Sequence, residues 1–136
     1  MSEPQLNATA SCELFVAPGD LASSLSADPQ ESFPPVLATS RMVAVMELAS
    51  ARLLRPLLGP GELSVGVTVD IAHTAATPPG VTVKALARYA GREGKLFVFE
   101  VVASDPGGEI GRGTHKRAII SAERLLSGAA KRNPKS

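Results

Sequence analysis

Three residues in the middle of the chain, Thr39, Glu47 and His73, carry side chains that together can catalyse hydrolysis. Glu47 is unusual because the surrounding residues 38–51 are mostly apolar and suit the interior of a protein. Removing a carboxylate from water is costly unless the group is paired, hydrogen-bonded or protonated. A sequence that keeps such a group often uses it for chemistry. Combined with an imidazole and a hydroxyl, this carboxylate predicts a hydrolytic site.

Each of the three residues also has a purely structural interpretation. Thr39 can cap the N-terminus of a helix, and Glu47 can form an ion pair with Arg117 or Arg52. His73 can be a strand-end histidine whose hydrogen bonds are satisfied. Their joint placement favours chemistry, because Thr39 and Glu47 are eight residues apart, which on a helix is roughly 12 Å of rise. A substrate can then lie along the helix between them while His73 approaches from a sheet.

The segment from Ser40 to Leu54 is predicted to be the one long helix. Apolar residues recur along it at the spacing of one helical face, namely Met42, Val45, Met46, Ala49 and Leu53. Thr39 or Ser40 can serve as its N-cap. Pro56 disfavours its continuation, and the Gly59-Pro60-Gly61 turn ends it.

Residues 63–73 are predicted to form a half-buried strand, because apolar and polar residues alternate along them. His73 continues the odd-numbered, apolar series, so we expect this face to point toward the helix. Turn-forming Gly and Pro residues separate four further expected strands, at about residues 13–16, 81–88, 95–104 and 109–122. The 95–104 strand is apolar on both faces and should be central. Gly111 and Gly113 are candidates for a bulge or a close backbone contact.

These elements predict an α+β domain in which an antiparallel sheet wraps around one central helix. We place this domain at residues 11–125. A disordered N-terminus is expected at residues 1–10, and a solvated, basic C-terminal tail at residues 126–136.

The composition argues against several classes of function. The 136 residues are 44% hydrophobic and carry a net charge of +1, so nothing indicates nucleic acid or a membrane as a partner. One Tyr and no Trp leave no stacking platform for bases. Cys12 is the only cysteine, and His73 and His115 lie on separate strands, so we expect no disulfide, metal or cofactor. With no signal peptide and no long apolar run, a soluble, cytoplasmic protein is expected.

Four segments carry a resemblance to a known family, at residues 33–39, 46–47, 72–80 and 109–117. The run His73-Thr74-Ala75-Ala76-Thr77-Pro78-Pro79-Gly80 is the most specific part. In these motifs the chain resembles the hot dog-fold acyl-CoA thioesterases of the fluoroacetyl-CoA thioesterase family. The resemblance implies a hot dog fold and a homodimer that pairs edge to edge, with active sites at the dimer interface.

The same resemblance implies roles for individual residues. It implies a catalytic set formed by Thr39, Glu47 and His73. It also implies substrate-binding residues, with Gly66 near the thioester carbonyl, Phe33 as an aromatic gate over the acyl pocket and Arg117 as a basic residue near the site. The lid of the fluoroacetyl enzyme is aromatic, whereas residues 25–32 have no aromatic side chain. Selectivity for a fluoroacyl group therefore stays open.

We expect a thioester hydrolase that cleaves a short-chain acyl-CoA, of the fluoroacetyl-CoA kind or another, to the free acid and CoA. Glu47 would attack the carbonyl or act as a base toward water, and both routes stay open. His73 would transfer protons near neutral pH. One alternative is a non-catalytic acyl-CoA-binding hot dog domain, which has no reason to keep a buried carboxylate. The other is a hydratase on the same fold, for which Asp70 beside His73 is the only candidate pair.

Overall fold

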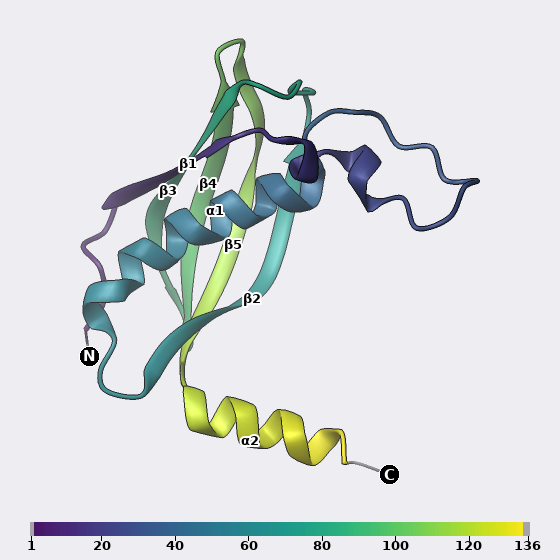
Figure 1. The fold of residues 1–136 in the computed structure, drawn as a ribbon. Coiled ribbons are helices and arrows are strands. Elements are labelled where there is room, and N and C mark those ends of the chain that lie inside the picture. The colour runs from purple at the N-terminus through teal and green to yellow at the C-terminus, as the bar shows by residue number, and fades with distance from the viewer. Residues whose placement is uncertain (1, 135–136) are drawn as a thin grey trace.

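The computed structural model describes residues 2–134, in which one long helix lies in the curl of a five-stranded antiparallel sheet (Figure 1). Helix α1 spans Thr39–Leu54. The strands are β1 (Thr9–Phe15), β2 (Glu62–His73), β3 (Thr82–Glu93), β4 (Leu96–Asp105) and β5 (Gly108–Ser121). Their order across the sheet is β1-β3-β4-β5-β2, so β1 and β2 are the edges. The predicted α+β plan, a sheet wrapped around one central helix, is confirmed.

Helix α1 forms where the apolar stripe predicts it and lays that stripe on the sheet, except that Leu54 is buried at its end and the predicted Leu53 is only partly buried. The buried apolar residues of the helix are Met42, Val45, Met46, Ala49 and Leu54. The largest buried side chains of the facing strands are Tyr89 on β3 and Phe99 on β4. Strand β4 is the middle strand of the sheet, as predicted. Burial of this apolar surface fixes the helix, and with it every side chain that α1 presents to a site.

The start of α1 differs from the prediction that Thr39 or Ser40 caps it. Ala38 occupies the N-cap position, and no side chain caps the first turn. Backbone bonds fix the entry instead, because the Ala38 N–H donates to the Asp20 carbonyl at 2.9 Å. Thr39 is the first helical residue, and its hydroxyl is available for another partner.

Strand β2 changes its inward face halfway along, at a β-bulge. Before the bulge Gly66 pairs with Arg117, and after it Val69 pairs with His115. Both partners on β5 are buried on the side of α1. Paired residues share a face, so even-numbered residues point toward α1 before the bulge and odd-numbered residues after it. The predicted odd-numbered inner face is therefore right for His73 and wrong for the first part of the strand.

Secondary structure crosses the expected domain limits at both ends of the chain. Strand β1 begins at Thr9, inside the segment that we expected to be disordered. The Tyr89 hydroxyl donates to the Glu3 carboxylate at 2.5 Å, which ties this segment to β3. Beyond β5, Ala122–Arg132 form helix α2, which projects from the end of the sheet (Figure 1) and has no buried residue. The domain limits at 11 and 125 stay predictions.

The predicted close backbone contact lies at the two glycines of β5. A Cβ atom on Gly113 would lie 2.0 Å from the backbone oxygen of Asp70 on β2. A Cβ atom on Gly111 would lie 2.7 Å from the backbone oxygen of Ala72. Strand β2 can therefore approach β5 here only because both positions lack a side chain.

Gly113→Ala is expected to lower the free energy of unfolding by about 1–3 kcal/mol, because β2 must move away from β5 to admit the methyl group. Urea unfolding measures the change. Gly19→Ala is the control, since a Cβ there would meet nothing within 4 Å, and it should change stability by less than about 0.5 kcal/mol. Equal midpoints for the two variants would contradict the close contact.

Candidate active site

At one end of α1, Thr39 and His73 form a hydrogen-bonded pair. Thr39 Oγ1 lies 2.8 Å from Nδ1 of His73. Thr39 begins α1, and His73 is the last residue of β2. The other ring nitrogen, Nε2, is buried and has no hydrogen-bond partner among the described residues. A histidine oriented through one nitrogen, with the other uncommitted, is suited to transferring a proton.

Glu47 lies two turns further along α1, in a second cluster. Its Oε2 is 3.3 Å from Nη1 of Arg117 and 3.9 Å from Nε2 of His115. The side chain of Glu47 is 39% exposed, whereas that of Arg117 is 8% exposed. The prediction that the carboxylate is buried is therefore wrong for a single chain, because β2 is the edge of the sheet and no further strand within residues 2–134 covers it. Arg117 is the ion-pair partner, whereas Arg52 donates to the backbone oxygen of Ser11.

Gly66 leaves room for the Glu47 carboxylate. A Cβ atom on Gly66 would lie 2.5 Å from Oε2 of Glu47 and 3.1 Å from Cε1 of His115. The structure therefore brings together three residues that the sequence analysis singled out separately, namely Glu47, Gly66 and Arg117.

Arg117 is a buried cation fixed by β2. Its Nε donates to Ser64 Oγ at 3.2 Å, and its Nη2 donates to the Ser64 backbone oxygen at 3.0 Å. Burial lowers the pKa of Arg117, and the Glu47 carboxylate opposes this shift. Among residues 2–134, Glu47 is the one nearby counter-charge to this buried positive charge.

Sequence reasoning missed His115, which we considered only as a metal ligand. Its side chain is 1% exposed and lies beside Arg117 in the same cluster. Burial lowers its pKa. A signal was present in the sequence, because His115 precedes Arg117 by two residues and so shares its face of the strand.

The two clusters are separate within one chain. No hydrogen bond or ion pair between described residues joins Glu47 to Thr39 or His73. The rise along α1 between Thr39 and Glu47 is roughly 12 Å. Each cluster borders its own open hollow, of about 400 Å³ beside His73 and about 320 Å³ beside Glu47. A single thioester carbonyl cannot contact both clusters of one chain.

Phe33, the predicted gate, lies in the loop between the short 3-10 turn at Ala22–Leu25 and α1. This loop stands out from the body of the protein (Figure 1). The neighbouring Pro34 lines the hollow beside Thr39 and His73, but Phe33 does not, and its side chain is 46% exposed. The structure therefore brings the loop, and not the aromatic ring, to the hollow, and the gate stays a prediction.

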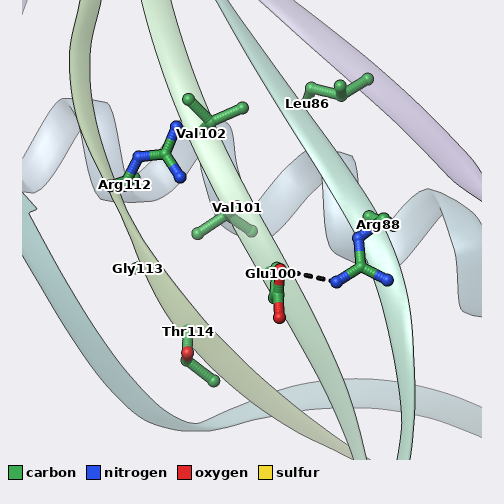
Figure 2. Close-up of a pocket in the computed structure, with 8 residues that line it drawn as sticks. All are labelled: Leu86, Arg88, Glu100, Val101, Val102, Arg112, Gly113 and Thr114. Carbon is green, nitrogen blue, oxygen red and sulfur yellow. Dashed lines mark ion pairs between the residues drawn. The ribbon is translucent and has the colours of Figure 1, made fainter. Parts of the chain in front are cut away.

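A further hollow of about 310 Å³ lies on the opposite face of the sheet, away from α1 (Figure 2). Its walls include the ion pair between Arg88 and Glu100, at 2.6 Å. It contains none of the predicted site residues. The α1 side of the sheet is therefore the candidate site.

Two other features are absent from residues 2–134. These residues include no cluster of three His, Cys, Asp or Glu side chains able to hold a metal ion. Within the same range, no helix is long and apolar enough to cross a membrane.

Gly66→Ala is expected to displace the Glu47 carboxylate, because the new methyl group occupies its place. Because the carboxylate is at the end of a flexible side chain and can move, the free energy of unfolding should fall by less than about 1 kcal/mol. Hydrolysis that depends on Glu47 should fall at least about tenfold. Gly59→Ala is the matched control, since its Cβ would also meet a carboxylate, that of Glu62, at 3.2 Å. Equal activity of the two variants would separate Gly66 from the site.

Comparison with known proteins identifies the family to which the chain belongs. Residues 17–123 match the family model described as fluoroacetyl-CoA-specific thioesterase. A fluoroacetyl-CoA thioesterase from Streptantibioticus cattleyicolor is 44% identical over 102 residues, which cover 75% of this chain and 73% of the relative.

Solved structures confirm the predicted hot dog fold. A structure of a fluoroacetyl-CoA thioesterase superposes with a TM-score of 0.91 at 36% identity, over 98% of this chain and 100% of that one. A thioesterase superfamily member from Thermus thermophilus gives a TM-score of 0.85 at 28% identity, over 96% and 94% of the two chains. A hot-dog-like protein from Thermanaerovibrio acidaminovorans, at 21% identity and a TM-score of 0.82 over 96% and 94% of the two chains, shares the fold. The chain therefore belongs to the fluoroacetyl-CoA-specific thioesterase family of hot dog-fold thioester hydrolases.

Proposed function

We propose that this protein hydrolyses a short-chain acyl-CoA to the free acid and CoA, at a site that two copies of the chain complete. Family membership supports thioester hydrolysis. The observation that carries the composite site is the division of the predicted catalytic residues into two clusters. Thr39 and His73 form one cluster, and Glu47 lies with Arg117 in the other.

Strand β2 offers the surface through which two copies would join. It is a 12-residue edge strand, and Val67 and Val69 on it are 50% and 48% exposed. A long edge strand with exposed apolar residues pairs readily with another strand. A two-fold axis through the middle of β2 would pair two copies of it antiparallel, which continues the sheet and makes a homodimer.

This pairing would bring the two clusters together. Pairing centred on the middle of β2 sets the end of one strand opposite the start of its partner. His73 of one protomer then lies within about two residues, or roughly 7 Å along the strand, of Ser64 of the partner subunit. Ser64 contacts Arg117, which lies beside Glu47. The Thr39–His73 pair of one copy and the Glu47 carboxylate of the other would then face one substrate.

The chemistry follows from the groups that meet there. Glu47, charged beside Arg117, either takes a proton from an attacking water or attacks the carbonyl carbon itself to form an anhydride that water opens. A backbone N–H near Gly66 would donate to the oxyanion. The C–S bond breaks, and the leaving thiolate takes a proton from His73, whose ring Thr39 orients. In the base route Glu47 then passes the proton that it took to His73, which restores both groups. In the anhydride route His73, after giving its proton to the thiolate, takes one from the water that opens the anhydride. The acid product leaves as a carboxylate, and its proton goes to solvent.

The acyl group is expected to be short. Phe33 would restrict its length as a gate over the acyl pocket. Residues 25–32 add no further aromatic side chain to the loop. We therefore expect broad acceptance of small acyl groups, with fluoroacetyl-CoA as one substrate among them.

The proposed cellular location follows from the proposed substrate. Acyl-CoA thioesters are made and consumed inside the cell. Cys12 is a free, buried thiol, which is compatible with a reducing compartment. We therefore place the activity in the cytoplasm.

The two alternatives fit the geometry less well. A non-catalytic acyl-CoA-binding domain has no use for the Glu47 carboxylate, which is held against the buried Arg117 in space left by Gly66. A hydratase would need Asp70 to act with His73. The two residues are three apart on one strand and point to opposite faces of it. Both observations favour hydrolysis.

His73→Ala and Glu47→Gln should each lower CoA release at least about 100-fold. Co-expression of the two variants should restore about a quarter of the parental activity, because about half of the dimers are mixed and each mixed dimer has one intact site of two. If one chain supplied the whole site, mixed dimers would have no intact site and no rescue would occur. A thiol-reactive dye measures CoA release.

Two further substitutions test whether rescue depends on pairing through β2. Val69→Asp, added to both variants, should prevent rescue, because it places a charge among the exposed apolar residues that the pairing of β2 would cover. Leu126→Asp changes an exposed leucine on α2 and should leave rescue intact. Mixed dimers without rescue would contradict the composite site, and a fully active Glu47→Gln would contradict the catalytic role of Glu47.

A further inference from the structure

His115 is a buried imidazole that the proposed mechanism does not use. Its Nδ1 lies 2.8 Å from the backbone oxygen of Thr68, and its Nε2 lies 3.1 Å from Nη1 of Arg117. Oε2 of Glu47 is 3.9 Å from Nε2, which is beyond hydrogen-bonding distance. The ring therefore reaches the Glu47 carboxylate through Arg117 and not directly.

The two partners of His115 fix its protonation state. A backbone carbonyl only accepts hydrogen bonds, so Nδ1 must carry the hydrogen that it shares with Thr68. A guanidinium only donates, so Nε2 must be bare and accept from Arg117. His115 is therefore neutral, with its hydrogen on Nδ1. Burial disfavours the charged ring as well and lowers the pKa of His115.

Arg117 has a fixed direction because each of its three side-chain nitrogens donates at least one hydrogen bond. Nε and Nη2 donate to Ser64, at 3.2 and 3.0 Å. Nη1 donates to His115 at 3.1 Å and to Glu47 at 3.3 Å. The two hydrogens of Nη1 have fixed directions in the plane of the guanidinium, so the bond to His115 also sets where the other hydrogen points. That other hydrogen meets Glu47.

A neutral acceptor suits this position better than a charged residue does. A carboxylate in place of the ring would pair with Arg117 and compete with Glu47 for its charge. A cation would repel Arg117 and offer no acceptor. A neutral imidazole satisfies Nη1 and leaves the positive charge of Arg117 directed at Glu47.

We propose that His115 is a positioning residue of the active site, which holds Arg117 so that Arg117 holds the Glu47 carboxylate in place. The inference rests on the catalytic role proposed for Glu47. Gly66 completes the arrangement, since its missing side chain leaves the space into which Arg117 draws the carboxylate.

Two substitutions separate this role from simple core packing. His115→Leu keeps a similar volume but removes the acceptor, so kcat for acyl-CoA hydrolysis should fall about 10- to 100-fold while KM changes less than about threefold. His115→Gln can accept from Arg117 through its amide oxygen and should keep kcat within about fivefold of the parent. Tyr89→Phe is the control. It also removes a hydrogen bond of a buried side chain, the one from Tyr89 to Glu3, but this bond lies away from the site, so kcat should not change.

A double-mutant cycle tests whether His115 acts through Glu47. In the Glu47→Gln background, His115→Leu should lower kcat no further, because the group that it positions is already gone. Parental kcat in His115→Leu, with Glu47→Gln inactive, would overturn the positioning role alone. Parental kcat in Glu47→Gln would overturn the catalytic role proposed for Glu47 as well. Equal losses in His115→Gln and His115→Leu would also overturn the positioning role.

A spectroscopic measurement on the unmutated protein keeps the proposal testable if His115→Leu fails to fold. Nitrogen-15 NMR of the His115 ring should show a neutral imidazole with its hydrogen on Nδ1 at pH 7. A protonated ring, or a neutral ring with its hydrogen on Nε2, cannot accept from Arg117 and would overturn the proposal.

Discussion

The contact between Glu47 and Arg117 is the interaction on which the candidate site depends. Three elements must cooperate to make it, because α1 carries the carboxylate, β5 carries the guanidinium and β2 leaves space at Gly66. The bulge in β2 is equally necessary, since it turns both Gly66 and, further along, His73 toward α1. The apolar core beneath α1 has the role of holding these elements in register.

The proposed two-copy site would make activity depend on assembly. Glu47 is half-exposed at an unpaired strand edge, and His73 lies at the far end of the same strand. In the proposed function, the two clusters of a single chain are half-sites along the same edge, and one substrate cannot contact both of them. A second copy on that edge would cover the exposed apolar residues of β2 and complete the chemistry in the same step. Stability of the interface and catalysis then depend on the same strand.

The sequence predicts the elements of this fold well because each is encoded locally. The apolar stripe of α1 and the alternation of the strands need no information from distant residues. The bulge in β2 was not predicted, because residues 63–73 alternate without interruption. The cap at Thr39 was wrong because backbone bonds from elsewhere fix the helix start. Glu47 had two possible arginine partners, and His115 forms a hydrogen bond with a backbone carbonyl 47 residues away in the sequence. Such pairings are settled only in three dimensions.

The most direct measurement is a crystal structure of the protein with a non-hydrolysable ketone analogue of a short acyl-CoA. The proposed composite site predicts that the ketone carbon lies within about 4 Å of groups from both chains. His73 should come from one protomer and Glu47 from the other. An analogue held between His73 and Glu47 of the same protomer, or one that contacts neither, would contradict it.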